Sequence, residues 1–168
     1  MKFLVIRLPL AVIFFSLSFV LFGQTIMTQV VVHTPDWEFS SSETRPDSIS
    51  VQLRELMHTF ESGVMEALFD MGMICFNNPP IFQPNPMSLR DHGSTVLTAR
   101  TGGAQYVVVI ETAYSVGDRG ISQGLSVIMQ LINDRGELIH TQELSSITPG
   151  SAFSQGQRST RTLLASVI

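Results

Sequence analysis

The feature that most constrains the fold is a stripe of apolar residues between positions 49 and 71. They recur at spacings of three, four and occasionally one, which is the pattern of an α-helix buried along one side. Gly72 then provides a stop signal. Such a helix must cover the face of a sheet or another helix. The stripe consists of Ile49, Leu53, Leu56, Phe60, Val64, Ala67, Leu68 and Met71.

Three segments around this helix have the composition of strands. Residues 28–33 are rich in β-branched side chains and predict a first strand, and residues 73–76 predict a short buried strand. Residues 104–111 form a nearly continuous apolar run, which is typical of a central strand covered on both faces. Four prolines between positions 79 and 86 predict a Pro-rich loop over residues 77–86.

The second half of the chain predicts a helix and a hairpin. Residues 87–100 favour a second, shorter helix, and residues 115–124 are glycine-rich and predict a connection without regular structure. Residues 125–133 and 137–144 are separated by a tight Asp-Arg-Gly turn and predict an antiparallel pair.

The end of the chain favours one more helix. Residues 145–156 are rich in Ser, Thr, Pro and Gly and are expected to form a loop, followed by a helix over residues 157–168. The predicted order is therefore β-α-β-α-β-β-β, with the closing helix left open. This order predicts an α/β (α+β) fold in which a small mixed sheet is covered by two or three helices.

The first residues have the layout of a secretory signal. Lys2 and Arg7 give a basic start, and residues 8–22 follow without a charge and are rich in Leu, Val, Ile and Phe. An apolar stretch of about 7–15 residues behind a basic end is typical of a signal peptide. We therefore expect the chain to be exported to the periplasm.

Cleavage is expected after Gly23, because the peptidase needs a small residue there. Residues 1–23 would then be the signal peptide, and residues 24–168 would form a single domain. Gln24 stands where a lipoprotein carries its acylated cysteine, so no lipid anchor is expected. The uncharged stretch extends to Val32, which leaves an uncleaved membrane anchor as the alternative.

The charge of the exported part excludes one class of partner. Removing Lys2 and Arg7 from the 10 basic residues leaves 8 against 14 acidic residues, a net charge of −6. All of the remaining basic residues are arginine. Nucleic acids and anionic lipids need a clustered basic patch, so we expect neither as a partner.

The residues that usually carry catalysis or metal binding do not form a motif. The four histidines (His33, His58, His92 and His140) show no His-x-x-x-His spacing, and Cys75 is the single cysteine. His58 is expected on a solvated helix face, and Cys75 as a buried thiol, with a reactive or intermolecular thiol as the alternative. We therefore expect no enzyme, no cofactor and no metal site, although scattered carboxylates on loops leave a converging pair open.

Two weak candidates for a partner surface remain. Trp37 and Phe39 lie in a polar segment, residues 34–47, that is expected to be an exposed loop. An aromatic pair there either folds back on the core or forms a docking patch. Arg158 and Arg161 are expected on one side of the final helix.

Four stretches also match a known type of domain. They are the helix end Ala67-Leu68-Phe69-Asp70-Met71-Gly72, the short strand Met73-Ile74-Cys75-Phe76, the run Gly103-Ala104-Gln105-Tyr106-Val107-Val108-Val109, and the turn Asn133-Asp134-Arg135-Gly136-Glu137. With them, residues 50–145 resemble the anticodon-binding-like α/β domain shared by several bacterial envelope proteins. These include the amino-terminal domain of the Tol-system propeller protein, the curli secretion lipoprotein, the penicillin-binding-protein activator lipoprotein and certain flagellar outer-membrane proteins.

The resemblance implies a fold and a place in the cell envelope, since its motifs mark fold positions and not reacting atoms. Gln105 stands where the group usually has Asp, and the acylated cysteine of the lipoprotein members is missing. We therefore expect a non-enzymatic adaptor or assembly factor that binds another envelope protein in flagellar, secretion or wall-synthesis machinery. A small-ligand-binding protein that uses the sheet edge and the Pro-rich loop is the alternative, and a homo-oligomer is left open.

Overall fold

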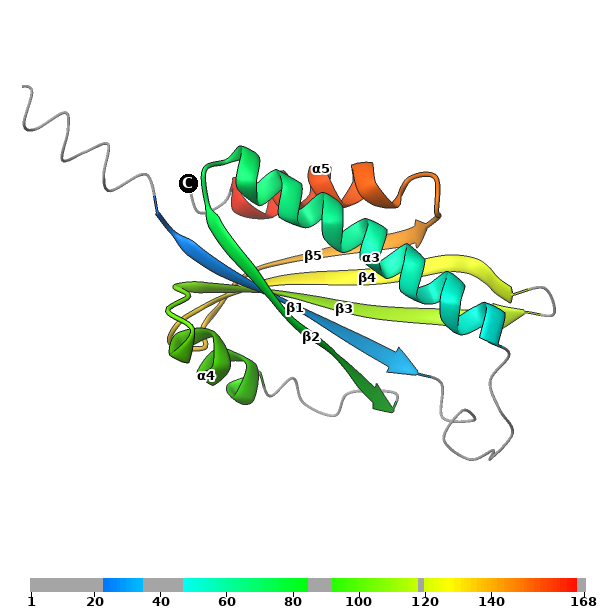
Figure 1. Ribbon diagram of the computed structural model, residues 1–168, viewed down its shortest axis with the longest axis horizontal. Coiled ribbons are helices and arrows are strands. Elements are labelled where there is room, and N and C mark those ends of the chain that lie inside the picture. The colour runs from blue at the N-terminus through cyan, green and yellow to red at the C-terminus, as the bar shows by residue number, and fades with distance from the viewer. Residues whose placement is uncertain (1–22, 35–46, 85–91, 118–119, 166–168) are drawn as a thin grey trace, which may run out of the picture.

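The computed structural model describes residues 23–34, 47–84, 92–117 and 120–165, and the predicted loop around Trp37 and Phe39 lies outside these ranges. They form one sheet with helices on both of its faces (Figure 1). In chain order the elements are β1 (Thr25–Thr34), α3 (Asp47–Asp70), β2 (Ile74–Pro84), α4 (Gly93–Thr101), β3 (Tyr106–Gly117), β4 (Gly120–Asn133), β5 (Leu138–Ile147) and α5 (Ala152–Leu164). The predicted order and the mixed α/β class are confirmed, and the closing helix is present.

The strand order across the sheet is β2-β1-β3-β4-β5. β1 pairs in parallel with both β2 and β3, whereas β3, β4 and β5 are antiparallel neighbours. The chain moves from β1 to β2 in one direction and from β2 across β1 to β3 in the other. Because crossovers between parallel strands are right-handed, α3 and α4 lie on opposite faces of the sheet (Figure 1).

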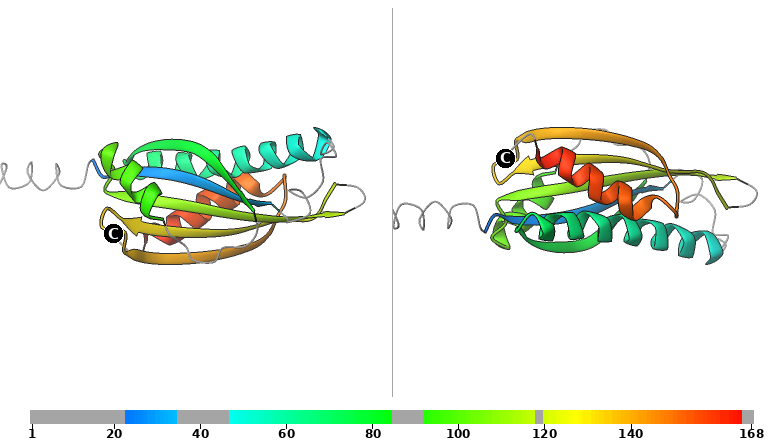
Figure 2. Two further views of the ribbon diagram at one scale, coloured as in Figure 1. Left: turned by 90° about the horizontal axis from the view of Figure 1, so that it is seen from below. Right: turned by 90° about the horizontal axis from the view of Figure 1, so that it is seen from above.

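The hydrophobic core lies mainly between the sheet and the pair α3 and α5, which lie side by side over one face (Figure 2). It contains most of the predicted apolar stripe, including the fully buried Val64 and Leu68. A second, smaller cluster lies between the sheet and α4. In β3, Val108 and Ile110 face the first cluster and Val107 and Val109 the second, which confirms a central strand covered on both faces.

Two glycines bring α3 and α5 into backbone contact. A Cβ atom at Gly156 would overlap the carbonyl oxygen of Phe60 and lie 3.2 Å from the backbone nitrogen of Val64. A Cβ atom at Gly63 would overlap the carbonyl oxygen of Phe153 in the same way. Only glycine permits this approach, because the obstructing atoms belong to backbone that cannot rotate away.

The prediction that residues 77–86 form a loop is wrong for residues 77–84. β2 runs through Pro79 and Pro80 and ends at Pro84. Proline is tolerated there because β2 is an edge strand, so the missing N–H groups need not serve a second neighbour. The register shift between Gln29 and Val31 lies where the two adjacent prolines pass β1, as a bulge does.

Three other boundaries differ from the sequence prediction. The segment 115–124 is largely strand, because Val116 pairs with Ile121 and Gly117 with Gly120, which extends the β3–β4 ladder. α4 begins only at Gly93 among the described residues. α5 begins at Ala152, within the segment expected to be a loop, and packing of Ala152, Gly156 and Ser159 against the core outweighs their local preference. Among the described helices, none is long and apolar enough to cross a membrane.

Candidate functional site

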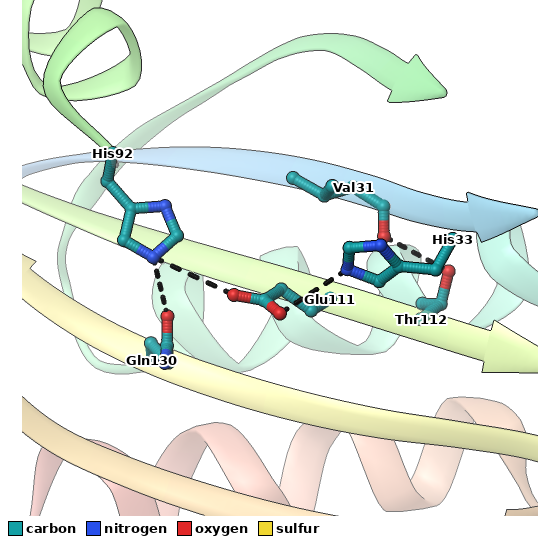
Figure 3. A network of polar contacts seen from close by, with 6 residues as sticks. All are labelled: Val31, His33, His92, Glu111, Thr112 and Gln130. Carbon is teal, nitrogen blue, oxygen red and sulfur yellow. Dashed lines mark hydrogen bonds and ion pairs between the residues drawn. The ribbon is translucent and has the colours of Figure 1, made fainter. Parts of the chain in front are cut away.

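A cluster of polar side chains is buried on the face of the sheet that carries α4 (Figure 3). The Glu111 side chain is 5% exposed and lies between two imidazoles. His33 Nε2 lies 3.4 Å from Glu111 Oε2, and His92 Nε2 lies 3.7 Å from Glu111 Oε1. His92 Nε2 also lies 2.8 Å from the amide oxygen of Gln130.

Strand alternation explains how these residues meet. Glu111 follows Val107 and Val109 at a spacing of two on β3, so it shares their face of the sheet. Val31 of β1 is the register partner of Glu111, and His33 lies two residues further along β1 on the same face of the sheet. His92 directly precedes α4 and reaches the cluster from the α4 side of the sheet (Figure 3).

His92 Nε2 faces the oxygens of Gln130 and Glu111, and a proton on that nitrogen would point toward acceptors. His33 Nδ1 is buried and has no hydrogen-bond partner among the residues that the structure describes. No group of three or more His, Cys, Asp or Glu residues within the described ranges could hold a metal ion.

A cavity of about 410 Å³ lies between α4 and the turn that joins β4 to β5. Two arginines, one aspartate and apolar residues of α4 are among the residues that line it. His92 borders both the cavity and the buried cluster. The lining residues are His92, Gly93, Val96, Leu97, Arg100, Asp134, Arg135 and Gly136.

Two ionisable side chains on the opposite face have shifted pKa values. Partial burial raises the pKa of Glu61, although the charge of His58 and hydrogen bonds from Asn77 and Thr28 partly oppose the rise. Burial likewise raises the pKa of the Cys75 thiol, which packs against the larger core. Cys75 is partly buried, between the two alternatives drawn from the sequence.

Of the surface residues singled out in the sequence, the structure describes the two arginines of α5. Trp37 and Phe39 lie outside the described residues. Arg158 is exposed on α5, and Arg161 forms an exposed ion pair with Asp70 at the end of α3, with a distance of 2.6 Å between Nη2 and Oδ2. His58 is exposed on α3, as predicted.

The buried cluster was not predicted from the sequence. Its one visible signal is that Glu111 ends an apolar strand and His33 ends another. Parallel neighbours bring such strand ends together, but the sequence does not give the register.

The two edges of the sheet differ in how open they are. β2 carries three prolines, which hinder pairing with a further strand. β5 carries none, and among the described strands it pairs with β4 alone, on one side. Leu138 and Ile139 on β5 are 54% and 39% exposed. The β5 edge is therefore the better template for an additional strand.

Comparisons with known proteins identify no family. No family model matches the chain, and the search of curated proteins finds no significant match. The chain is similar in structure to a PelC dodecamer from Paraburkholderia phytofirmans, with 16% identity, a TM-score of 0.45, and 84% of this chain and 87% of that chain covered.

It is also similar to the C-terminal domain of LpoB from Salmonella enterica, with 18% identity, a TM-score of 0.34, and 75% and 84% of the two chains covered. The same domain from Escherichia coli gives 18% identity, a TM-score of 0.31 and coverage of 72% and 80%. At these identities and TM-scores the likeness carries no inference about family or function, and the resemblance drawn from sequence motifs stays a prediction.

Proposed function

We propose that this chain is an exported, non-enzymatic adaptor or assembly factor that binds another protein of the cell envelope. The signal-like first 23 residues, the acidic and lysine-free remainder and the resemblance of residues 50–145 to envelope domains support this proposal. Flagellar assembly, secretion and wall synthesis are the processes that the resemblance suggests.

The open edge of β5 is the observation that carries the proposal. An edge strand presents a row of unpaired backbone donors and acceptors, and an extended segment of a partner can add to it as a further strand. Exposed Leu138 and Ile139 supply apolar contacts beside those groups. The prolines of β2 direct such pairing to the β5 side of the sheet.

The absence of catalysis is part of the same proposal. The side chains of Glu111 and His33 are 5% and 8% exposed. A substrate could therefore contact them only if the residues packed around them moved away. A buried carboxylate that accepts hydrogen bonds from imidazoles is a common way to satisfy polar groups inside a fold. This supports a structural role for the cluster.

Photo-crosslinking in cells that express the full chain tests the proposal. A photo-reactive residue is placed at Glu143 on β5 and, in a second protein, at Glu66 on α3; both positions are exposed. We expect Glu143 to capture one envelope protein and Glu66 to capture none.

A matched pair of substitutions then assigns the contact to the strand edge. Ile139→Lys places a charge on the β5 edge and should abolish capture, whereas Ile74→Lys places the same charge on β2, where Ile74 is 58% exposed, and should not. Equal loss with both variants, no capture from Glu143, or capture of only a second copy of this chain would refute the adaptor.

A further inference from the structure

The cavity between α4 and the β4–β5 turn gathers positive charge on an acidic protein. Arg100 and Arg135 both line it, against the single carboxylate of Asp134. The whole chain has a net charge of −4. Two arginines and one aspartate at one small cavity give a local excess of one positive charge.

Neither arginine is engaged by a carboxylate of the described chain. Arg161 shows the contrast, since it is paired with Asp70 at 2.6 Å. No ion pair joins Arg100 or Arg135 to an acidic residue within the described ranges. Their donors therefore remain available, and a guanidinium offers a planar fork that matches a carboxylate or phosphate with two parallel hydrogen bonds.

The remaining walls are suited to a small organic ligand. Val96 and Leu97 of α4 give an apolar strip beside the arginines. A volume of about 410 Å³ lies within the range of small-molecule sites. Backbone at Gly93 and Gly136 lines the same space without a side chain to obstruct it.

We infer that this cavity binds a small anionic ligand, whose carboxylate or phosphate group lies between Arg100 and Arg135 and whose apolar part contacts Val96 and Leu97. The site does not depend on the proposed function, because it lies at α4 and the turn before β5 and not along the outer edge of β5. It also differs from the ligand site expected from the sequence, which used the sheet edge and the Pro-rich segment.

Titration at low salt with sodium hexanoate and with phenyl phosphate tests the inference, followed by NMR of the isotope-labelled protein. Hexylammonium serves as the control of opposite charge. We expect at least one anion to saturate and to shift the amide signals of Gly93 and Gly136, and the cation to shift neither. Saturation by hexanoate alone assigns a carboxylate ligand, and saturation by phenyl phosphate alone assigns a phosphate.

Substitutions separate a built site from general attraction to positive charge. Arg100→Gln and Arg135→Gln should each weaken the binding by about tenfold, the effect of one charge-assisted hydrogen bond. Arg158→Gln removes the same charge from α5, outside the cavity, and should change the affinity by less than about twofold. An equal loss in all three variants, or no saturable binding of either anion, would overturn the inference.

Discussion

The contact between α3 and α5 gives a prediction in which two known effects have opposite signs. Gly156→Ala replaces a glycine inside a helix, which by helix propensity alone stabilises the fold by about 1 kcal/mol. The new methyl group, however, would overlap the carbonyl oxygen of Phe60 and lie 3.2 Å from the nitrogen of Val64. Both atoms belong to the backbone of α3, so only a separation of the two helices relieves the overlap.

That separation disturbs well-packed core. Phe60 and Val64 are 1% and 0% exposed, so moving the helices apart loosens contacts on both of them. Overpacking in a core costs about 1–3 kcal/mol, and a rigid obstacle places this site at the upper end. Subtracting the propensity gain leaves a predicted loss of about 2 kcal/mol in the free energy of unfolding.

Urea unfolding followed by circular dichroism measures this loss as a lower midpoint at unchanged slope. Gly150→Ala is the matched control, because a Cβ there has no atom within 4 Å, and it should stay within about 0.5 kcal/mol of the parent. Gly63→Ala should resemble Gly156→Ala, and the double variant should lose less than the sum, since the helices separate only once. A stabilised Gly156→Ala would show that propensity decides and would refute the close approach.

Three further predictions concern the ionisable groups. Glu111→Ala leaves the buried His33 and the partly buried His92 without their carboxylate and should cost about 1–3 kcal/mol in urea unfolding. Glu143→Ala at an exposed position should cost less than about 0.5 kcal/mol, and equal costs would contradict burial of Glu111. Because burial raises the pKa of Glu61, the folded state holds that proton more tightly, and the parent should lose stability as pH rises from its ordinary pKa of 4.5 through the raised value. Glu61→Gln should not show this loss, so its stability relative to the parent increases over that window; a pH-independent difference in urea midpoints would contradict the shift. The raised pKa of Cys75 predicts slower thiolate alkylation at pH 8 in the folded protein than in urea, and equal rates would show an unprotected thiol.

Local patterns predicted the elements of this fold better than their boundaries. The apolar stripe ending at Gly72 and the apolar run before Glu111 each bury a face in one repeating pattern, and both are found as helix and strand. The β2 prolines misled because their effect depends on the position of the strand: at an edge they cost little, in the centre they would break the ladder. Whether a strand lies at the edge or in the centre depends on the whole sheet, so it cannot be predicted from residues 77–86 alone.

The buried cluster of His33, His92, Glu111 and Gln130 could not be predicted from the sequence for a related reason. Glu111 and His33 are distant in the chain, and their contact depends on the parallel register of β1 and β3. His92 joins them only because the crossover through α4 returns over that face of the sheet. The role of the two glycines could not be predicted either. In the sequence Gly63 only lowers the helix propensity, and its role follows from the close approach of α5, which the sequence does not show.

The most direct test of the account is where the chain works and in what form. Cells that express the full sequence are fractionated, and the intact mass of the protein in each fraction is measured. We expect most of the protein in the envelope fraction, with the mass of a chain that begins at Gln24. Full-length chain free in the cytosol, with Met1 to Gly23 still attached, would contradict the claim that the domain acts outside the cytoplasm.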